Sequence, residues 1–288
     1  MKRLPLILLL CFVAAAAAAQ TVRPPDDFTT GQPVGDRRPM PFPFLRYDDI
    51  VWTTDHWRTI ELAERFNQFM YYPDDPYINF GKKSLAYILW DAMAAGEIPI
   101  YEDDDLKVPL DNEAFVRRYT KPDTILLELG YDDETDTEIY ETVIVPKNFD
   151  GADIKRYDLR MTWFIGKQDT RQDFRNIALA PMKETYREVP GIEDIYLGCL
   201  PIFWVPMQHP AVRTLLARYT AYIDENNVVR QPSWDWVFLN QYYHAYTSRE
   251  TNPFGRTIDS YLTGDDALLE AAIIEEQVFE IENGMWEQ

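Results

Sequence analysis

The chain has 288 residues, of which 46% are hydrophobic and 14% aromatic, so it is long enough to bury a substantial core. Its formal net charge is −20, from 48 acidic and 28 basic side chains. This charge argues against nucleic acid as a partner, because nucleic-acid binding depends on cationic side chains that release counterions. It also disfavours docking onto anionic lipid, whereas it suits a basic protein partner or simply solubility.

The first 19 residues have the layout of a secretory signal peptide. A basic start precedes an apolar run from Leu4 to Ala18, and small residues at positions 17 and 19 suit a signal-peptidase site before Gln20. The run is shorter than the roughly 20 residues that cross a bilayer core. We therefore expect export and cleavage of residues 1–19, with no direct membrane insertion of the remaining chain. Cys199 is then the only cysteine, and we expect it to be a small buried hydrophobe.

Residues 20–47 are predicted to form an extended, proline-rich arm. Six prolines recur here without a helical or strand period, and each fixes φ and removes a backbone donor. Phe42 and Phe44 alternate with prolines, and we expect them to pack either on the chain's own domain or on a neighbouring subunit. Residues 48–288 are predicted to form a single domain.

The predicted domain opens with two helices. The first is expected over residues 55–66, because Trp57 and Ile60 begin an apolar stripe at helical spacing. The second is expected over residues 84–95, with Gly96 directly after its end.

The middle of the chain is predicted to be rich in β-strands. Two apolar, β-branched runs, 124–130 and 138–146, flank an acidic turn and predict a hairpin. Segments 160–165 and 176–182 are expected to supply further strands. The run 195–207 is continuously apolar, which predicts a central strand covered on both faces.

The C-terminal third is predicted to be helical again. Pro210 suits the first position of a helix that extends to Tyr222, and Ser233 can cap a helix over residues 234–245. The last helix is expected over residues 265–285, with two aspartates near its positive N-terminus. The predicted fold class is therefore α+β: a mostly antiparallel central sheet flanked by helices, preceded by the extended arm.

No sequence motif indicates catalysis or cofactor binding. His56, His209 and His244 lie far apart without ligand-spaced neighbours, so no metal site is predicted. Nucleophile-elbow and glycine-rich nucleotide-binding patterns are absent from the sequence. We therefore predict no enzyme activity, no catalytic residue and no cofactor. A carboxylate pair typical of glycoside hydrolases stays open, because its two acids can lie anywhere in so acidic a chain.

The aromatic content is the unusual feature of this sequence. Eight Trp, 18 Tyr and 15 Phe occur, several of them in tight groups. Large aromatic side chains supply core packing first and protein-interface anchors second, and they also line sugar sites. The candidate partner-binding residues are Phe42, Phe44, Trp52, Trp57, Tyr71 and Tyr72. The alternative function is an exported glycan-binding protein or a carboxylate-dependent glycoside hydrolase of the envelope.

An ordered set of motifs resembles the GldN/PorN family of Bacteroidetes. Residues 46–58 carry the first motif, which continues to the Tyr-Tyr-Pro of residues 71–73. Residues 250–256, 264–270 and 279–287 look similar to the same family near the C-terminus. The order of these motifs makes the resemblance more specific than any one of them.

The resemblance implies a periplasmic structural subunit of the type IX protein secretion machinery, which is linked to gliding motility in some members. It implies a ring of neighbouring copies formed with a GldK/PorK-like outer-membrane lipoprotein, and a contact with the periplasmic part of a GldM/PorM-like motor protein. No catalytic residue or cofactor comes with the family. Without a lipid anchor of its own, the protein would need the lipidated partner to hold it at the inner face of the outer membrane.

Overall fold

The structure is a computed structural model. It describes residues 38–73, 82–120, 123–132, 137–145, 149–167, 172–189, 192–223 and 232–286. The predicted signal peptide and the arm residues before position 38 lie outside the described residues.

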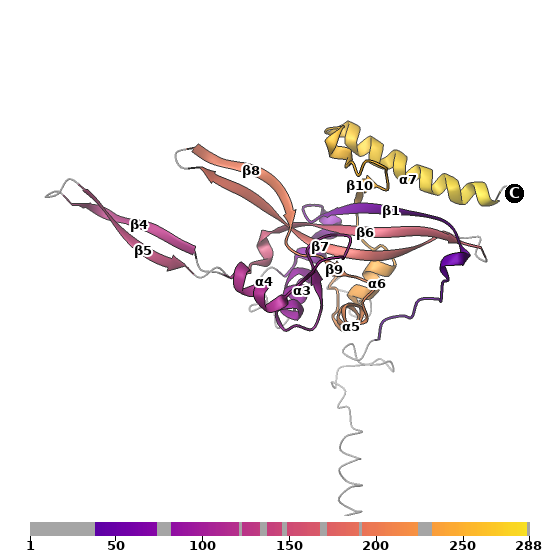
Figure 1. Ribbon diagram of the computed structural model, residues 1–288, viewed down its shortest axis with the longest axis horizontal. Helices are drawn as coiled ribbons and strands as arrows, with labels where there is room; N and C mark the ends of the chain where they lie inside the picture. Colours follow the sequence, from indigo (N-terminus) through magenta and orange to yellow (C-terminus); the bar gives the residue numbers. More distant parts are fainter. Residues whose placement is uncertain are drawn as a thin grey trace, which may run out of the picture. The chain divides into compact units, whose positions relative to one another are not determined.

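An antiparallel sheet forms the centre of the described chain (Figure 1). Its strands follow the order β10-β1-β6-β7-β8, and β9 also pairs with β7. Their bounds are β1 Ile50–Glu61, β6 Ile154–Gly166, β7 Gln172–Val189, β8 Ile192–Pro201, β9 Val205–Pro206 and β10 Tyr246–Glu250. All of these pairings are antiparallel, so the predicted α+β class with its antiparallel central sheet is confirmed.

Strand β1 occupies the segment for which we predicted a helix over residues 55–66, so that prediction was wrong. The strand pairs along its length with β6 and near its C-terminal end with β10. Its sequence is rich in Thr, Trp, Val and Ile, which fit a pleated, half-buried surface. The three-residue spacing of Trp57 and Ile60 was compatible with a helix, but hydrogen-bonded neighbours on both sides favour the strand.

The predicted strand over residues 195–207 is corrected as well. Strand β8 ends at Pro201 and lies at the edge of the sheet, and a separate short strand, β9, follows it. Gly198 has φ +113°, and the pairing with β7 shifts register there and skips Leu197, as in a β-bulge. Ile195, Leu197 and Leu200 are consequently exposed rather than covered on both faces.

Two smaller antiparallel pairs complete the strands. Strands β4 (Asp123–Asp132) and β5 (Thr137–Val145) form the predicted hairpin, which is therefore confirmed. Strands β2 (Ile100–Tyr101) and β3 (Pro109–Leu110) form the other pair.

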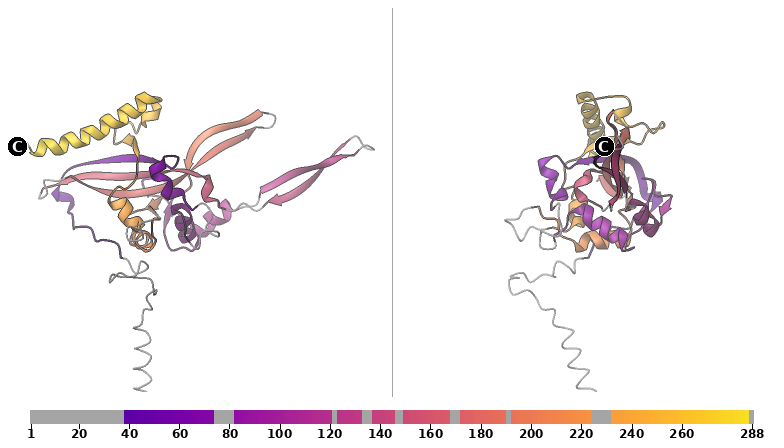
Figure 2. Two further views of the ribbon diagram at one scale, coloured as in Figure 1. Left: turned by 180° about the vertical axis from the view of Figure 1, so that it is seen from behind. Right: turned by 90° about the vertical axis from the view of Figure 1, so that its left-hand side faces the viewer.

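The helices lie before and after the sheet strands in sequence. Their bounds are α2 Gln68–Tyr71, α3 Leu85–Ala94, α4 Asn112–Tyr119, α5 Pro210–Arg218, α6 Trp234–Leu239 and α7 Asp265–Trp286. Short 3₁₀ turns cover Tyr47–Asp49, Arg65–Asn67, Gly151–Asp153 and Ile258–Ser260. Helices α3, α5 and α6 lie below the sheet in Figure 1, and α7 lies above β1 and β10; the views of Figure 2 agree.

Local sequence signals set the helix ends that we predicted. Gly96 follows α3 with φ +72°, the left-handed conformation common just past a helix. His209 caps α5 by accepting from the backbone N–H of Ala211 (3.3 Å). Helix α6 ends at Leu239, earlier than predicted, because Gln241 adopts φ +49° and breaks the helical path.

The main core lies between the sheet and helices α3, α5 and α6. It joins residues of β1, β6 and β7 to apolar side chains of these helices. Trp234, Tyr157 and Phe203 are among the largest side chains that are fully buried. Cys199 is half-buried beside a small satellite cluster that contains Trp204, so it is less covered than we expected. No helix among the described residues is long and apolar enough to cross a bilayer.

Candidate interaction surface

A groove rich in aromatic side chains lies between the segment that contains α2 and the segments that follow α5 and α6. We call it the aromatic groove and define it by Arg65, Phe66, Gln68, Phe69, Tyr72, Tyr222, Ile223 and Tyr242. The hollow measures about 690 Å³. Phe66 and Tyr72 are 44% and 53% exposed, so its walls present large rings to solvent.

Buried Asn67 fixes the two walls of the aromatic groove against each other. Its side-chain amide donates to the carbonyl oxygens of Glu61 (2.9 Å) and His244 (2.8 Å). Its side-chain oxygen accepts from the backbone N–H of His244 (2.8 Å). A fully buried amide with three such bonds joins segments that are far apart in sequence, and it holds the groove in one geometry.

The rings of the groove pack on one another and on the core. Phe66 and Tyr242 lie with ring centroids 5.0 Å apart, and Phe69 stacks on buried Trp234 at 5.8 Å with an interplanar angle of 19°. Tyr242 also contacts Trp236 at 5.9 Å. Trp234 of α6 therefore forms a rigid floor under aromatic rings whose outer edges face solvent.

Two of the predicted partner-binding residues lie at this site. Tyr72 lines the groove, and Tyr71 packs against the main core while its ring meets that of Tyr72 edge-on at 5.0 Å. The sequence prediction did not include Phe66 and Phe69. Their signal was the recurrence of aromatic residues every three positions, at 66, 69 and 72. Phe66 lies in a 3₁₀ turn, Phe69 in α2 and Tyr72 directly after that helix, and all three line the groove.

The described part of the arm contacts the chain's own domain through Phe42. The guanidinium carbons of Arg175 and Arg213 lie 4.1 Å and 4.0 Å from the centre of its ring. Arg213 also donates to the carbonyl oxygen of Met40 (2.6 Å). Phe44 is 87% exposed, so the two arm phenylalanines have different environments.

The predicted tryptophans of β1 lie in a third environment. The indole N–H of Trp57 donates to Asp104 (2.6 Å), and the guanidinium carbons of Arg249 and Arg160 lie 3.6 Å and 5.3 Å from its ring. These contacts tie β1 to the loop between β2 and β3. Trp52 is half-buried on the same strand. The six predicted residues thus have separate surroundings, apart from the contact between Tyr71 and Tyr72.

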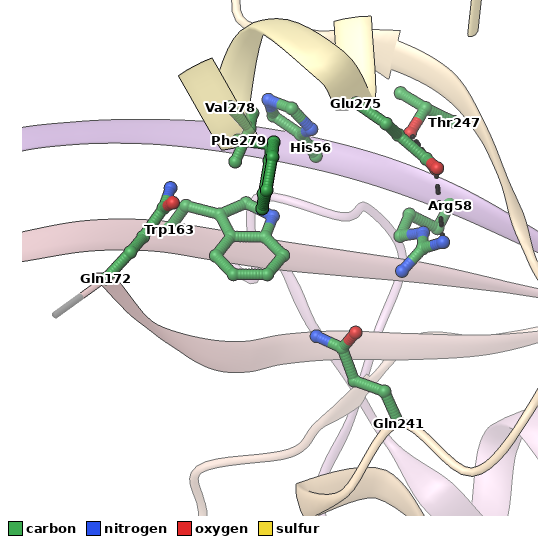
Figure 3. Close-up of a pocket in the computed structure, with 9 residues that line it drawn as sticks. All are labelled: His56, Arg58, Trp163, Gln172, Gln241, Thr247, Glu275, Val278 and Phe279. Carbon is green, nitrogen blue, oxygen red and sulfur yellow. Dashed lines mark hydrogen bonds and ion pairs between the residues drawn. The ribbon is translucent and has the colours of Figure 1, made fainter. Parts of the chain in front are cut away.

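A second hollow, of about 270 Å³, lies between the sheet and α7 (Figure 3). Arg58 donates to the carboxylate of Glu275 (3.1 Å), and the hydroxyl of Thr247 donates to the same oxygen (3.0 Å). These bonds connect α7 to β1 and β10. Phe279 and Val278 of α7 complete the lining, so this hollow is a feature of the α7 attachment.

Buried His56, which lines this second hollow, predicts a pH dependence of stability. Burial, together with a smaller effect of Arg58 that Asp55 partly opposes, lowers its pKa from 6.5 to about 4. Between pH 6.5 and about 4 the unfolded chain therefore binds a proton here that the folded chain does not. The free energy of unfolding should fall with decreasing pH in this window, by up to about 1.4 kcal/mol per pH unit from this group.

The variant His56→Gln isolates this contribution from that of the carboxylates. Denaturation curves measured from pH 7 to pH 4 should show a shallower loss of stability for the variant than for the wild type. Parallel curves for the two proteins would contradict the assignment to His56.

Among the described residues, no group of three or more His, Cys, Asp or Glu side chains is placed to hold a metal ion. His244, at the edge of the aromatic groove, instead faces the carboxylate of Glu64 at 3.1 Å.

Most of the chain matches one known protein family. A family model described as "Gliding motility associated protein GldN" matches residues 45–287. The match includes both walls of the aromatic groove, the sheet and α7. No curated protein matches the chain.

Proposed function

The chain belongs to the GldN family, and from this premise we propose that it is a non-enzymatic structural subunit of the type IX protein secretion machinery. It acts in the periplasm, where a GldK/PorK-like lipoprotein holds it at the inner face of the outer membrane. Neighbouring copies form a ring with that lipoprotein, and a GldM/PorM-like motor protein contacts the ring. The family's association with gliding motility and type IX secretion supports this role.

The aromatic groove is the observation that carries a binding role. Interface energy concentrates in a few large aromatic side chains that sit in well-packed surroundings. Phe66 and Tyr72 meet this description, because core residues support them while their outer edges stay exposed. The bonds of Asn67 fix the groove before binding, which reduces the ordering cost of association.

The arm supports a second and different contact face. A ring built from one kind of subunit needs two unlike surfaces on each copy, one that meets the preceding copy and one that meets the next. Phe42 anchors the arm on the domain, and the exposed Phe44 is left for a neighbour. We assign the arm to the contact between copies and the aromatic groove to a partner protein.

Truncation of the groove should weaken partner binding. Phe66→Ala and Tyr72→Ala are each expected to reduce the affinity for the partner that co-purifies with the wild type by about 30-fold, the equivalent of about 2 kcal/mol for an interface hot spot. Titration of purified full-length variants against that partner measures the effect. Tyr196→Ala, an equally exposed tyrosine on β8, is the matched control and should bind like the wild type. Equal affinities for all four proteins would remove the groove from the interface.

Aromatic rings also stack on sugars, so the same groove is the site at which the rival glycan function would act. Incubation of the purified chain with soluble peptidoglycan fragments separates the two functions. A structural subunit should neither bind nor cleave them. Saturable binding that Tyr72→Ala abolishes, or release of smaller sugars, would favour the rival.

A further inference from the structure

Buried hydrogen-bond donors gather at the hollow between the sheet and α7. The Nε atom of Arg58 and the amide nitrogens of Gln172 and Gln241 are buried, and none has a hydrogen-bond partner among the described residues. All three residues line this hollow. In Figure 3 the dashed bonds converge on Glu275, and none reaches either glutamine. A buried donor without an acceptor costs free energy, so three at one place point to an acceptor group from outside the chain.

The backbone of Gln241 supports the same interpretation. Gln241 is the second residue after α6 and has φ +49°. Glycine is the usual residue at this position past a helix, because a Cβ makes the left-handed conformation unfavourable. A glutamine here accepts that strain and places its amide in the lining of the hollow. Backbone strain of this kind is concentrated at functional sites.

The hollow also has an apolar wall and reaches the surface. Trp163 of β6 and two residues of α7, Val278 and Phe279, line it. Its volume of about 270 Å³ exceeds the roughly 150 Å³ of a cavity that holds benzene. Phe279 is 60% exposed, so a group from outside can enter beside it. Water can accept from the buried donors but gains nothing from the aromatic wall, whereas a ligand with an apolar part uses both.

The charges at the hollow favour an uncharged ligand. Arg58 is paired with Glu275 at 3.1 Å, so its positive charge is already balanced. His56 is neutral at pH 7, because burial above all lowers its pKa to about 4. The lining residues therefore have no net charge, and the chain as a whole is strongly acidic. An added carboxylate would be repelled, whereas the carbonyl oxygen of a neutral amide would not.

We propose that this hollow binds an uncharged peptide segment of a partner protein. An aromatic or aliphatic side chain of the segment packs against Trp163 and Phe279. Backbone carbonyl oxygens beside that side chain accept from Arg58, Gln172 and Gln241. A peptide suits the site because it carries acceptors and an apolar group close together without charge. The inference rests on the proposed function, because the segment belongs to another subunit of the assembly.

Ligand-observed NMR with the purified full-length chain tests the chemistry of the site. N-acetylphenylalanine amide carries a ring and neutral carbonyl groups, and it should bind saturably at roughly millimolar concentration. N-acetylphenylalanine carries a carboxylate and toluene carries no acceptor, so each should bind more weakly by about tenfold. A failure of the amide to bind saturably, or equal affinity for the carboxylate or for toluene, would overturn the proposal.

The variant Gln241→Met assigns the binding to this hollow. It keeps the length of the side chain but removes the donor, and it should weaken binding of the amide about tenfold, as expected for one hydrogen bond. Gln277→Met is the matched control, because Gln277 is an exposed glutamine of α7 outside the described lining of the hollow. It should bind like the wild type. Loss of binding in Tyr72→Ala but not in Gln241→Met would place the amide in the aromatic groove and overturn the proposal.

Thermal unfolding distinguishes a ligand-binding glutamine from a structural one. The amide nitrogen of Gln241 has no partner within the described part of the chain. Gln241→Met should therefore leave the unfolding midpoint of the free protein unchanged or raise it, because it removes an unpartnered buried donor. A midpoint lowered by several degrees would mean that the amide stabilises the fold itself, and the proposal would fall.

Photocrosslinking in the native envelope identifies the segment. A photoreactive phenylalanine analogue at Phe279 should capture one partner segment, in which an aromatic or aliphatic residue has uncharged neighbours. Addition of Gln241→Met should lower the yield about tenfold. The same analogue at Leu197, an exposed leucine of β8, should not reach the segment.

The crosslinking outcomes separate this proposal from the proposed function. Capture of a charged segment, or an intact assembly without the crosslink from position 279, would overturn the peptide site and leave the structural function standing. A chain that purifies without any partner would overturn both.

Discussion

Replacement of Arg213 by methionine is expected to lower the free energy of unfolding by about 3–5 kcal/mol. The Nε and Nη2 atoms of Arg213 each donate to a carboxylate oxygen of Asp235 at 3.2 Å, and both side chains are only 10% exposed. Removal of the cation leaves the carboxylate charged, buried and without this partner. Chemical denaturation of the full-length protein measures the loss.

Two comparisons make this prediction specific. Arg218→Met changes the same residue type on the same helix, but Arg218 is half-exposed and its distance to Glu97 is 4.0 Å, so the loss should stay below about 1 kcal/mol. The double variant Arg213→Met with Asp235→Leu removes both charges and should recover most of the stability. A loss for Arg213→Met no larger than that for Arg218→Met would contradict the role of the buried pair.

The same substitution should release the arm. Arg213 donates to the carbonyl oxygen of Met40 and stacks on Phe42, so it connects the arm to the pair that joins α5 and α6. In Arg213→Met the described part of the arm loses both of these contacts and keeps the one between Phe42 and Arg175. We expect proteolysis near residue 40 to be faster in the variant than in the wild type, under conditions where the domain stays folded in both proteins.

Replacement of Trp234 by alanine is expected to lower the free energy of unfolding by about 3–5 kcal/mol and to weaken partner binding together with it. Trp234 is 1% exposed and stacks under Phe69, so its removal leaves a cavity in the core directly below the aromatic groove. Denaturation and titration with the co-purifying partner measure the two effects on one sample.

Trp236→Ala is the matched control for this prediction. It removes the same side chain two positions along α6, but Trp236 is 42% exposed, so the stability loss should be under about 1 kcal/mol. If Trp234→Ala were destabilised yet bound the partner with wild-type affinity, the floor of the groove would not support binding. If both variants were equally stable, the packing described for α6 would be wrong.

Sequence reasoning predicted those elements whose local signals agree with their environment. Helices α3 and α5 begin near a serine cap and a proline at the first turn, and the hairpin β4–β5 surrounds an acidic turn. In each case the residues that determine the element lie within it. The α+β class followed from these elements and their order along the chain.

The two wrong predictions of element type and placement, for residues 55–66 and 195–207, concern segments whose state depends on distant partners. Strand β1 is decided by pairing with β6 and β10, which lie far along the chain, and its apolar residues happen to fit helical spacing. The run 195–207 has the composition of a buried strand, yet Gly198 and Pro201 divide it and place β8 at an edge. The apolar content of a strand does not by itself determine whether other elements cover its faces.

Only part of the candidate site could be predicted from the sequence. Tyr71 and Tyr72 are recognisable as an aromatic pair, but their grouping with Tyr242 arises from the long-range bonds of Asn67. Trp57, predicted as a partner contact from its aromatic surroundings, also contacts Asp104 and Arg249 of its own chain. Aromatic clustering identifies candidates, and burial and contacts distinguish anchors of the fold from anchors for a partner.

Purification of the tagged full-length chain from its native envelope tests the central claim most directly. A structural subunit of the type IX secretion machinery should elute in an assembly many times larger than its own 33.8 kDa, together with an outer-membrane lipoprotein and a motor protein. Recovery of the chain alone, as a monomer, from repeated preparations of intact envelopes would contradict the claim.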